Sequence, residues 1–503
     1  MTMTDHEASI ADGVSLDPYR PAFHFTPAEN WMNDPNGLVW IDDRYHLFFQ
    51  YNPEGADWGN MSWGHATSPD LLTWTEHPVA LPYRDDEQVF SGSVVVDHAN
   101  TSGFGDGVIP PLMAMYTSVY PDGRQAQSLA VSVDSGTTWH PFAGNPVLDR
   151  GSHAFRDPKV IRAADRDGRE RWVMVAVEAE RREVLVFSSD DLREWRHEST
   201  VGAFGPGGVV WECPDLFPLD VDDDPLRQRW VLLLSINPVG ADADPDGSSM
   251  AYLVGDFDGH RFTPDESPGW QRLDHGRDFY AGVTFDNAPD GRRIMLGWMN
   301  NWRYAADIPT APWRGAMSLP RELALRTIDG RVRLVQSLPR ELAAIDPAAG
   351  ETLLDGVDLD GVRRLPIGCN VLLDVEWEPR GARRIGMDLL VGDGTATRLS
   401  YDVESGRLSL DRSNSGHVDV HPDFPSSSRA LVPLREGRLR VQLAVDGCLV
   451  EVFADDGAVT VSDQAFADAD AVGGAVFADG PSTVWVRRRT ALAARDDPDV
   501  RRG

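Results

Sequence analysis

The sequence has very little lysine, little cysteine and no long apolar run. Lys159 is the only lysine, so arginine supplies 46 of the 47 basic residues, a bias that we attribute to codon usage. The cysteines Cys213, Cys369 and Cys448 are too few and too scattered for a disulfide framework or a zinc site. Apolar runs such as 231–236 stop far short of the ~18 residues that a membrane helix requires. We therefore expect that the protein is not stabilised by disulfide bonds and does not span a membrane.

Positive charge is also scarce. The 47 basic residues face 79 acidic ones, which gives a net charge of −32 and a pI near 4.7. Such a surface repels a polyphosphate backbone, so we expect no nucleic-acid partner and favour a neutral substrate. Residues 1–17 lack the basic region and the apolar core of a secretion signal. We therefore expect a cytoplasmic protein, and secretion stays open if a leader precedes this sequence.

Short β-rich runs separated by turn residues predict an all-β fold. A turn followed by an aromatic residue recurs at 68–74, 132–139, 189–195 and, more loosely, 256–262. The aromatic positions are 65, 56 and 67 residues apart. A repeated unit of about sixty residues gives about five units before residue 337, within the ~4–8 blades of known propellers. The repeat predicts a five-bladed β-propeller, and an irregular β-sandwich with chance spacing is the alternative.

The length and composition predict more than one folded domain. With 503 residues, 42% of them hydrophobic, the chain is long enough for two to four domains of ~150 residues. After the Ala/Pro/Gly-rich stretch 343–350, strong alternation returns: Leu439, Val441, Leu443 and Val445 share one strand face before a turn at 446–447. This region reads as a β-sandwich. The predicted parts are an N-terminal extension (1–20), the propeller (21–340), a linker (341–352), the β-sandwich (353–490) and a polar tail (491–503).

Three acidic motifs could carry chemistry. In Asn33-Asp34-Pro35-Asn36-Gly37 the turn residues would hold the Asp34 carboxylate at a strand entrance, although Asp34 could also merely cap its own turn. Arg156-Asp157-Pro158 forms a fixed charge pair that would keep Asp157 ionised, but surface pairs of this kind are common. Trp211-Glu212-Cys213 places a carboxyl group among apolar neighbours, as in a general acid or in a paired structural glutamate.

Together these motifs resemble the β-fructosidases of glycoside hydrolase family 32, the invertase, levanase and inulinase group. The resemblance extends, in the family's order, to the stretches 47–53, 58–66, 90–93, 278–281, 297–302, 313–323 and 449–453. It implies a five-bladed propeller joined to a β-sandwich, with three acids in a central funnel. By their motifs, Asp34 corresponds to the nucleophile, Glu212 to the acid/base and Asp157 to the acid that stabilises the transition state. The stretches 58–66, 300–301 and 313–323 look most like levanases and exo-inulinases, so fructan is expected ahead of sucrose.

The resemblance also implies substrate contacts around the acids. These are Asn33, Gln50, Trp58, Ser91, Arg156 and Tyr280, with Trp31, Phe90 and Trp298 as apolar walls. Each aromatic residue could equally belong to the core of a blade. Cys213 is expected to pack beside Glu212 rather than act as a nucleophile, because no base is evident next to it. The histidines show no metal-ligand spacing and the three-carboxylate mechanism needs no metal, so we expect no cofactor.

Four functions are compatible with these residues. The leading one is a retaining hydrolase that releases terminal β-D-fructofuranosyl units from levan, inulin, fructo-oligosaccharides or sucrose, with ~5–5.5 Å between nucleophile and acid. A fructosyltransferase would use the same fructosyl-enzyme with a sugar acceptor. A non-catalytic carbohydrate-binding propeller would not need all three acids, and an arabinan-cleaving propeller would invert the anomeric configuration. Whether the chain forms a homo-oligomer stays open.

Overall fold

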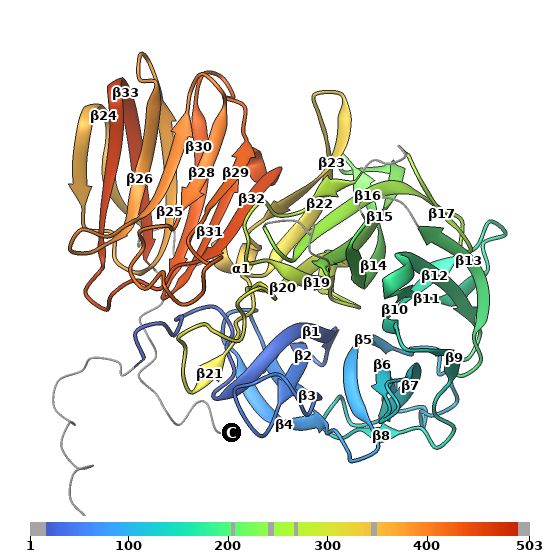
Figure 1. Ribbon diagram of the computed structural model, residues 1–503. Coiled ribbons are helices and arrows are strands. Elements are labelled where there is room, and N and C mark those ends of the chain that lie inside the picture. Colours follow the sequence, from blue (N-terminus) through green and yellow to red (C-terminus); the bar gives the residue numbers. More distant parts are fainter. Residues whose placement is uncertain (1–16, 203–206, 240–245, 266–269, 344–349, 491–503) are drawn as a thin grey trace, which may run out of the picture.

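The computed structural model describes residues 17–202, 207–239, 246–265, 270–343 and 350–490. The predicted tail at 491–503, most of the extension at 1–20 and the centre of the linker at 341–352 lie outside the described residues. The described part is almost entirely β-structure, with a propeller and a β-sandwich side by side (Figure 1). None of its helices is long or apolar enough to cross a membrane. The predicted fold class is therefore confirmed.

Five antiparallel blades stand in a ring around a central axis (Figure 1). Blades 1 to 3 are separate sheets, and blades 4 and 5 share a sheet through one parallel bridge between Val221 and Leu325. The strands of blades 1 and 2 are β1 (Asn30–Ile41), β2 (Arg44–Asn52), β3 (Ser62–Ser68), β4 (Thr75–Leu81), β5 (Gln88–Val96), β6 (Leu112–Val119), β7 (Gln125–Ser132) and β8 (His140–Pro141), with β9 (Leu148–Ser152) beside β7 and β21 (Trp313–Arg314) beside β1. Blades 3 to 5 comprise β10 (Phe155–Ala164), β11 (Glu170–Glu178), β12 (Glu183–Ser189), β13 (Arg196–Gly202), β14 (Val209–Val221), β15 (Asp224–Pro238), β16 (Ser249–Phe257), β17 (Phe262–Pro264), β19 (Tyr280–Thr284), β20 (Ile294–Trp298), β22 (Arg321–Ile328) and β23 (Arg331–Ser337), with β18 (Gln271–Arg272) beside β16.

The recurrent turn motif joins the third and fourth strands of blades 1 to 4. In blade 1, the Asp70 carboxylate accepts backbone N–H bonds from Leu72 and Thr73, and the Trp74 indole donates to the carbonyl of Leu71 at 3.1 Å. Equivalent indole bonds close the turns at Trp139 and Trp195, at 3.2 Å each. The aspartate fixes the turn and the tryptophan covers it, which explains why this pattern recurs at the same place in blades 1 to 3, with Phe262 at the aromatic position of blade 4.

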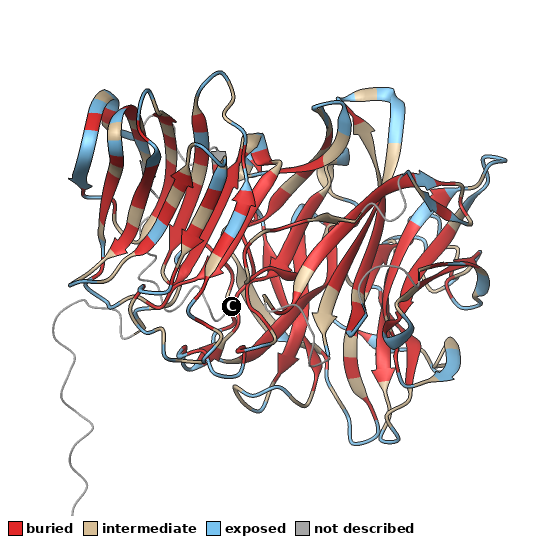
Figure 2. Cartoon of the chain, turned by 45° about the horizontal axis from the view of Figure 1, so that its top comes forward, coloured by how far each residue is buried: buried red, intermediate tan, exposed pale blue. Residues whose placement is uncertain are grey.

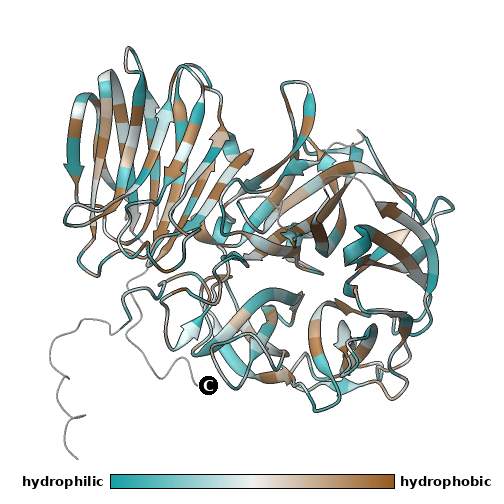
Figure 3. Ribbon diagram, viewed as in Figure 1, coloured by the Kyte–Doolittle hydropathy of each residue, from teal (hydrophilic) through white to brown (hydrophobic). Residues whose placement is uncertain are grey.

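The apolar core of the propeller lies between neighbouring blades. Phe48 and Trp63 of blade 1 pack in one cluster with Val94 and Tyr116 of blade 2. Figure 2 shows that most strand residues are buried, and Figure 3 shows apolar residues along the strands of all blades. Because each blade buries both faces, the innermost strands are held rigidly around the axis.

Three histidines stack inside blade 1. His46 Nδ1 and His65 Nε2 lie 3.1 Å apart, the ring centroids of His65 and His77 are 4.8 Å apart, and His65 also stacks on Phe48. Burial lowers the pKa of each histidine, that of His46 to about 4; neighbouring histidines add to the effect at His46 and His65, and the charge of Arg44 adds to it at His77. The histidines are therefore neutral in the folded protein at neutral pH.

This stack predicts a loss of stability in mild acid. Since the folded pKa values lie below the ~6.5 of an unfolded histidine, the unfolded state binds more protons below that pH. The free energy of unfolding should fall as the pH drops below ~6.5, and the contribution of His46 is lost at up to about 1.4 kcal/mol per pH unit down to about pH 4. His65→Phe keeps the ring stack and should make the curve of denaturation midpoint against pH flatter, whereas His140→Phe, at an exposed histidine, should leave it unchanged. Identical curves for the two variants would contradict this explanation.

The second domain is a two-layered β-sandwich. Its strands are β24 (Glu351–Leu365), β25 (Asn370–Glu378), β26 (Arg384–Val391), β27 (Thr397–Asp402), β28 (Arg407–Asp411), β29 (Ser427–Leu431), β30 (Leu439–Asp446), β31 (Leu449–Ala454), β32 (Val459–Gln464) and β33 (Gly473–Thr490). The long strand β33 pairs with β26 before Gly480 and with β25 after it, so it belongs to both layers. The predicted hairpin is β30–β31, with Gly447 in the left-handed region its turn requires. The short helices are η1 (Ala179–Arg181), η2 (Pro289–Gly291), α1 (Arg340–Ala343) and η3 (Asp455–Gly457).

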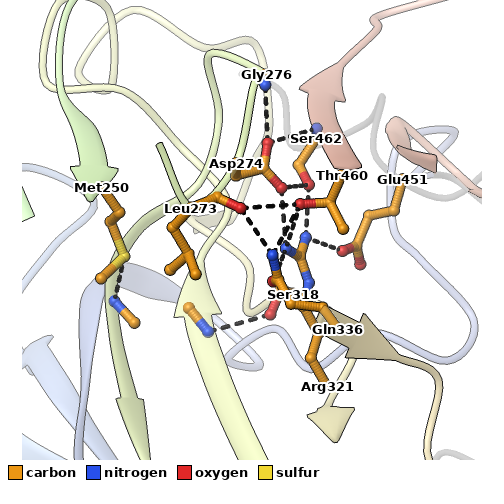
Figure 4. A network of polar contacts seen from close by, with 12 residues as sticks. Met250, Leu273, Asp274, Gly276, Ser318, Arg321, Gln336, Glu451, Thr460 and Ser462 are labelled. Atoms are coloured by element: carbon orange, nitrogen blue, oxygen red, sulfur yellow. Dashed lines mark hydrogen bonds and ion pairs between the residues drawn. The ribbon is translucent and has the colours of Figure 1, made fainter. Parts of the chain in front are cut away.

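A buried polar network joins the two domains. Arg321, on the propeller strand β22, donates to Asp274 at 2.9 Å and to Glu451 of the sandwich (Figure 4). Arg321, Asp274 and Glu451 are fully buried. Glu451 also accepts a 3.0 Å bond from His24, which lies ahead of the first blade. The chain ahead of blade 1, the propeller and the sandwich thus meet at one cluster of charges.

Candidate active site

The first strand of every blade is irregular where it passes the axis. These strands, β1, β5, β10, β14 and β19, contact one another in a ring. Their regular pairing is interrupted between Met32 and Pro35, Phe90 and Gly92, Arg156 and Lys159, Glu212 and Asp215, and Tyr280 and Val283. Such bulges redirect side chains. Asp34, Ser91, Asp157, Glu212 and Tyr280 all lie at these breaks, one from each blade.

Asp34 is held by neighbours from two blades. Its carboxylate accepts a 2.7 Å bond from the Ser91 hydroxyl of blade 2 and a 3.0 Å bond from the side-chain amide of Asn33. Asn33 is oriented in turn by a 2.7 Å bond from the Trp31 indole. Burial raises the pKa of Asp34 and the two donated bonds oppose that rise. The bond from Ser91 shows that the carboxylate is aimed at the axis rather than only capping its own turn.

Asp157 faces Asp34 from blade 3. Its carboxylate accepts the backbone N–H of Cys213 at 2.9 Å, and its own N–H donates to the Thr117 hydroxyl at 2.9 Å. The residue adopts a φ of +61°, an uncommon conformation for a side chain of this type that marks a constrained position. Burial raises the pKa of Asp157 to about 7, even though the charge of Arg156 opposes the rise.

Arg156 pairs with a second acid that the sequence did not predict. The sequence suggested that Arg156 keeps Asp157 ionised, yet its Nε lies 3.8 Å from that carboxylate while its Nη2 donates to Glu212 at 2.9 Å. The Arg156 guanidinium group extends to the first strand of blade 4, so its shorter bond is to Glu212 and not to Asp157. Arg156 therefore pairs with both acids: its charge opposes the rise in the pKa of Asp157, as the sequence predicted, and burial outweighs that effect.

Glu212 is the most accessible of the three acids. Its side chain is 19% exposed, compared with 7% for Asp157. Besides Arg156, it accepts a 2.5 Å bond from the Tyr280 hydroxyl and a 3.4 Å bond from the Asn237 amide. Burial and the charge of Glu212 raise the pKa of Tyr280 well above its usual range, so the phenol stays a donor. Glu212 is thus fixed in direction while open to a leaving group or a water.

Cys213 connects the three acids. It follows Glu212 in sequence, and its Sγ lies 3.6 Å from an Asp34 oxygen and 3.8 Å from an Asp157 oxygen. Burial and the surrounding carboxylates raise the pKa of Cys213 well above its usual range, so it remains a thiol and a weak donor. Cys213 thus links Asp34 to Asp157, and Arg156 links Asp157 to Glu212, so the three carboxyl groups lie close together at the axis.

The predicted aromatic contacts form two groups. Trp31 and Trp298 lie 6.1 Å apart, centroid to centroid, and both are buried. Trp58 meets Phe90 edge-on at 5.9 Å and is 49% exposed, so it lies at the rim of the funnel.

Gln50 donates to the carbonyl of Val89 at 3.1 Å. Gln50 therefore supports the strand that carries Phe90 and Ser91.

Three further residues contribute to the site although the sequence gave no specific reason to select them. Asn237 bonds Glu212, Thr117 holds the backbone of Asp157, and Trp302 stacks on Trp31 with centroids 6.1 Å apart. Asn237 pairs with Val210 across the β14–β15 hairpin, and that register would have placed it beside Glu212. Thr117 reaches the site from another blade, so its place depends on tertiary packing. None of the described residues forms a group of three side chains suited to a metal ion.

Glycosidases use carboxyl groups as nucleophile and as acid/base, so the three carboxyl groups at the axis of this propeller are typical of a glycosidase site. Comparison with known proteins is consistent with that class. The Glycosyl hydrolases family 32 N-terminal domain matches residues 24–337, and the Glycosyl hydrolases family 32 C terminal matches residues 360–491. The chain therefore belongs to glycosyl hydrolase family 32, and the family predicted from the motifs is confirmed.

Individual relatives resemble the chain over nearly its full length. A levanase from Bacillus subtilis is 41% identical over 94% of this chain and 70% of its own. An extracellular exo-inulinase from Aspergillus ficuum is 39% identical over 95% of this chain and 96% of its own. The crystal structure of an exo-inulinase from Aspergillus awamori superposes with a TM-score of 0.87 at 38% identity, covering 95% of this chain and 99% of that one.

Proposed function

We propose that this protein is an exo-acting, retaining hydrolase that releases terminal β-D-fructofuranosyl units from fructans and, as a second substrate, from sucrose. The proposal is carried by the convergence of Asp34, Asp157 and Glu212 at the axis, where Cys213 contacts the first two and Arg156 pairs with the last two. The levanase and exo-inulinase relatives support fructan as the main substrate.

The first step forms a bond between the enzyme and fructose. An ionised Asp34 oxygen attacks the anomeric carbon, the glycosidic bond breaks, and Glu212 gives its proton to the departing oxygen. Ser91 and Asn33 hold the Asp34 carboxylate in one orientation. Glu212 is directed by Arg156 and Tyr280 and faces the open side of the site, where a leaving group can depart.

The second step releases fructose. Glu212 takes a proton from a water, the hydroxide attacks the anomeric carbon, and the bond to Asp34 breaks, so the anomeric configuration is retained. Asp157 accepts hydrogen bonds from the hydroxyls of the ring and stabilises the positive charge that develops there. Hydroxyl donors favour the ionised carboxylate, so bound sugar lowers the pKa of Asp157 from its value of about 7.

A product analysis tests both the reaction and the substrate. Levan, inulin and sucrose are incubated side by side with the enzyme, and the products are followed by chromatography. Free fructose should appear from the first time points without intermediate oligosaccharides, and faster from a fructan than from sucrose. In proton NMR of the first product, the β-anomer should form before mutarotation.

The alternatives give different results in the same assay. An inverting arabinan-type enzyme would first form the other anomer, and a binding propeller would form no product. A transferase would convert concentrated sucrose mainly to new oligosaccharides instead of free fructose, because an acceptor sugar would compete successfully with water. Any of these outcomes would replace the proposed function.

A further inference from the structure

A large cleft separates blades 4 and 5 from the sandwich. It has a volume of about 1160 Å³ and is lined on one side by β18 and β23 and on the other by β28 and β29. Figure 1 shows β23 next to the sandwich edge that carries β29 and β32. None of the site residues described above lines this cleft. It is therefore a cavity separate from the glycosidase site.

The walls of the cleft carry an unusual set of arginines. Arg331 and Arg333 lie on β23, Arg407 on β28 and Arg429 on β29, and all four line the cleft. Among the residues that the structure describes, no carboxylate lies within 4 Å of any of these four guanidinium groups. The Nε of Arg333 is buried and has no partner within the described part of the chain. Arginines without partners are unexpected in a chain in which 79 acidic residues outnumber 47 basic ones.

The strand registers bring these charges together in pairs. Arg331 and Arg333 are two apart on β23, so both point to the same face of that strand. Across β28 and β29, Arg407 is opposite Leu431 and Arg429 is opposite Ser409, which places both arginines on one face. Like charges that share a sheet face repel each other. On the sandwich wall, Asp402 of β27 lies opposite Arg407 and offsets part of this repulsion, whereas Arg331, Arg333 and Arg429 have no carboxylate within 4 Å among the described residues.

The acidic residues of the cleft are already paired elsewhere. Asp329 and Asp455 both bind Arg435, at 3.3 and 2.7 Å, and Asp265 pairs with Arg229. Neither Arg435 nor Arg229 lines the cleft. These acids are thus neutralised by cations outside the cleft. Inside it, Arg272 pairs with Asp246, which leaves Arg331, Arg333 and Arg429 as the arginines available to another anion.

We propose that this cleft binds an oligoanion, a ligand with two or more phosphate or carboxylate groups. The planar guanidinium fork matches both groups with two parallel hydrogen bonds. A single inorganic phosphate is too small to reach both walls of a cleft of about 1160 Å³. Leu431, which is 68% exposed between the arginines, offers an apolar surface to a ligand with a carbon skeleton.

Isothermal titration of the whole protein with two probes tests the proposal. Tripolyphosphate carries phosphate groups and trigalacturonate carries carboxylates. Binding of either probe at 50 mM salt supports the site, and the tighter of the two shows whether the cleft prefers phosphate or carboxylate groups. The variant Arg331→Gln/Arg429→Gln removes one charge from each wall and should weaken binding about tenfold or more. Its hydrolytic rate should equal that of the wild type, because neither arginine touches the funnel.

A matched variant distinguishes binding in the cleft from general electrostatic attraction between the anion and the protein surface. Arg363 and Arg364 are exposed on β24, away from the cleft, so Arg363→Gln/Arg364→Gln makes the same change in net charge elsewhere. This control should bind both probes as the wild type does. Equal weakening in both double variants, or no binding of either probe at 5 mM, would overturn the proposal. Displacement of the bound anion by the neutral tetrasaccharide nystose, measured in the inactive Asp34→Asn variant, would also overturn it, because the cleft would then recognise neutral sugar.

Discussion

Replacing Asp34 by asparagine is expected to lower kcat on fructan on the order of 10⁴-fold, because the amide cannot form the fructosyl ester. The fold should not suffer. Burial raises the pKa of Asp34, which means that its ionised form is costly in the folded state. The neutral amide removes that cost and can still bond with Ser91 and Asn33, so the melting temperature should stay equal or rise slightly. Steady-state kinetics and thermal unfolding measure the two effects.

A control on the same strand makes this result specific. Asp43 lies in the turn at the other end of β1, with a φ of +56° that asparagine also tolerates. Asp43→Asn therefore makes the same chemical change far from the funnel and should keep full activity. If Asp34→Asn kept more than a tenth of the wild-type rate, Asp34 would not be the nucleophile.

The companion change Glu212→Gln distinguishes the acid from the nucleophile. It should lower kcat on natural substrates about as much as Asp34→Asn does. With p-nitrophenyl β-D-fructofuranoside, the rate of the first step should fall much less, since that leaving group departs without a proton. A burst of p-nitrophenol would then precede slow release of fructose, and rapid-mixing absorbance would detect it. An equal loss on both substrates, with no burst, would assign Glu212 another role.

The sequence was most informative where a local pattern and a chemical requirement coincide. The turn residues after Asp34 and the prolines after Asp157 and Cys213 mark the bulges that direct side chains to the axis. The repeated aspartate and tryptophan turns predicted the blades because each motif is complete within a few residues. Such features depend on local backbone geometry, so they can be recognised without knowing the fold.

Contacts between blades could not be predicted in the same way. Arg156 was assigned to its neighbour in sequence, Asp157, yet a long side chain at a bulge reaches the acid of the next blade. Thr117 and Asn237 support the acids from strands whose register depends on the lengths of loops. The pKa of Asp157 depends on how completely the blades exclude water, and no motif encodes that burial.

The junction of the domains is the second place where a large effect is expected. Arg321 lies within the stretch 313–323 that identified the family, but its sequence context gave no reason for its presence. In the structure its guanidinium group stacks on Phe279 at 3.9 Å and binds Asp274 of the propeller and Glu451 of the sandwich. The pKa of Asp274 and that of Glu451 are both lowered, with the charge of Arg321 opposing the effect of burial. Asp274 therefore depends on Arg321, and Glu451 depends on Arg321 together with His24.

Arg321→Met should destabilise the protein by about 3–5 kcal/mol, because it removes the cation of buried Asp274 and one of the two cations beside buried Glu451, the other being His24. Chemical denaturation should show a much lower midpoint, and the two domains should begin to unfold separately. Arg326→Met is the matched control: it lies on the same strand β22, is partly exposed and pairs with Asp223, so its loss should cost less than about 1 kcal/mol. Adding Asp274→Asn and Glu451→Gln to Arg321→Met should recover part of the stability, since the buried charges are then gone. If this triple variant were no more stable than Arg321→Met, the stabilising part of Arg321 would be its packing on Phe279 rather than its charge.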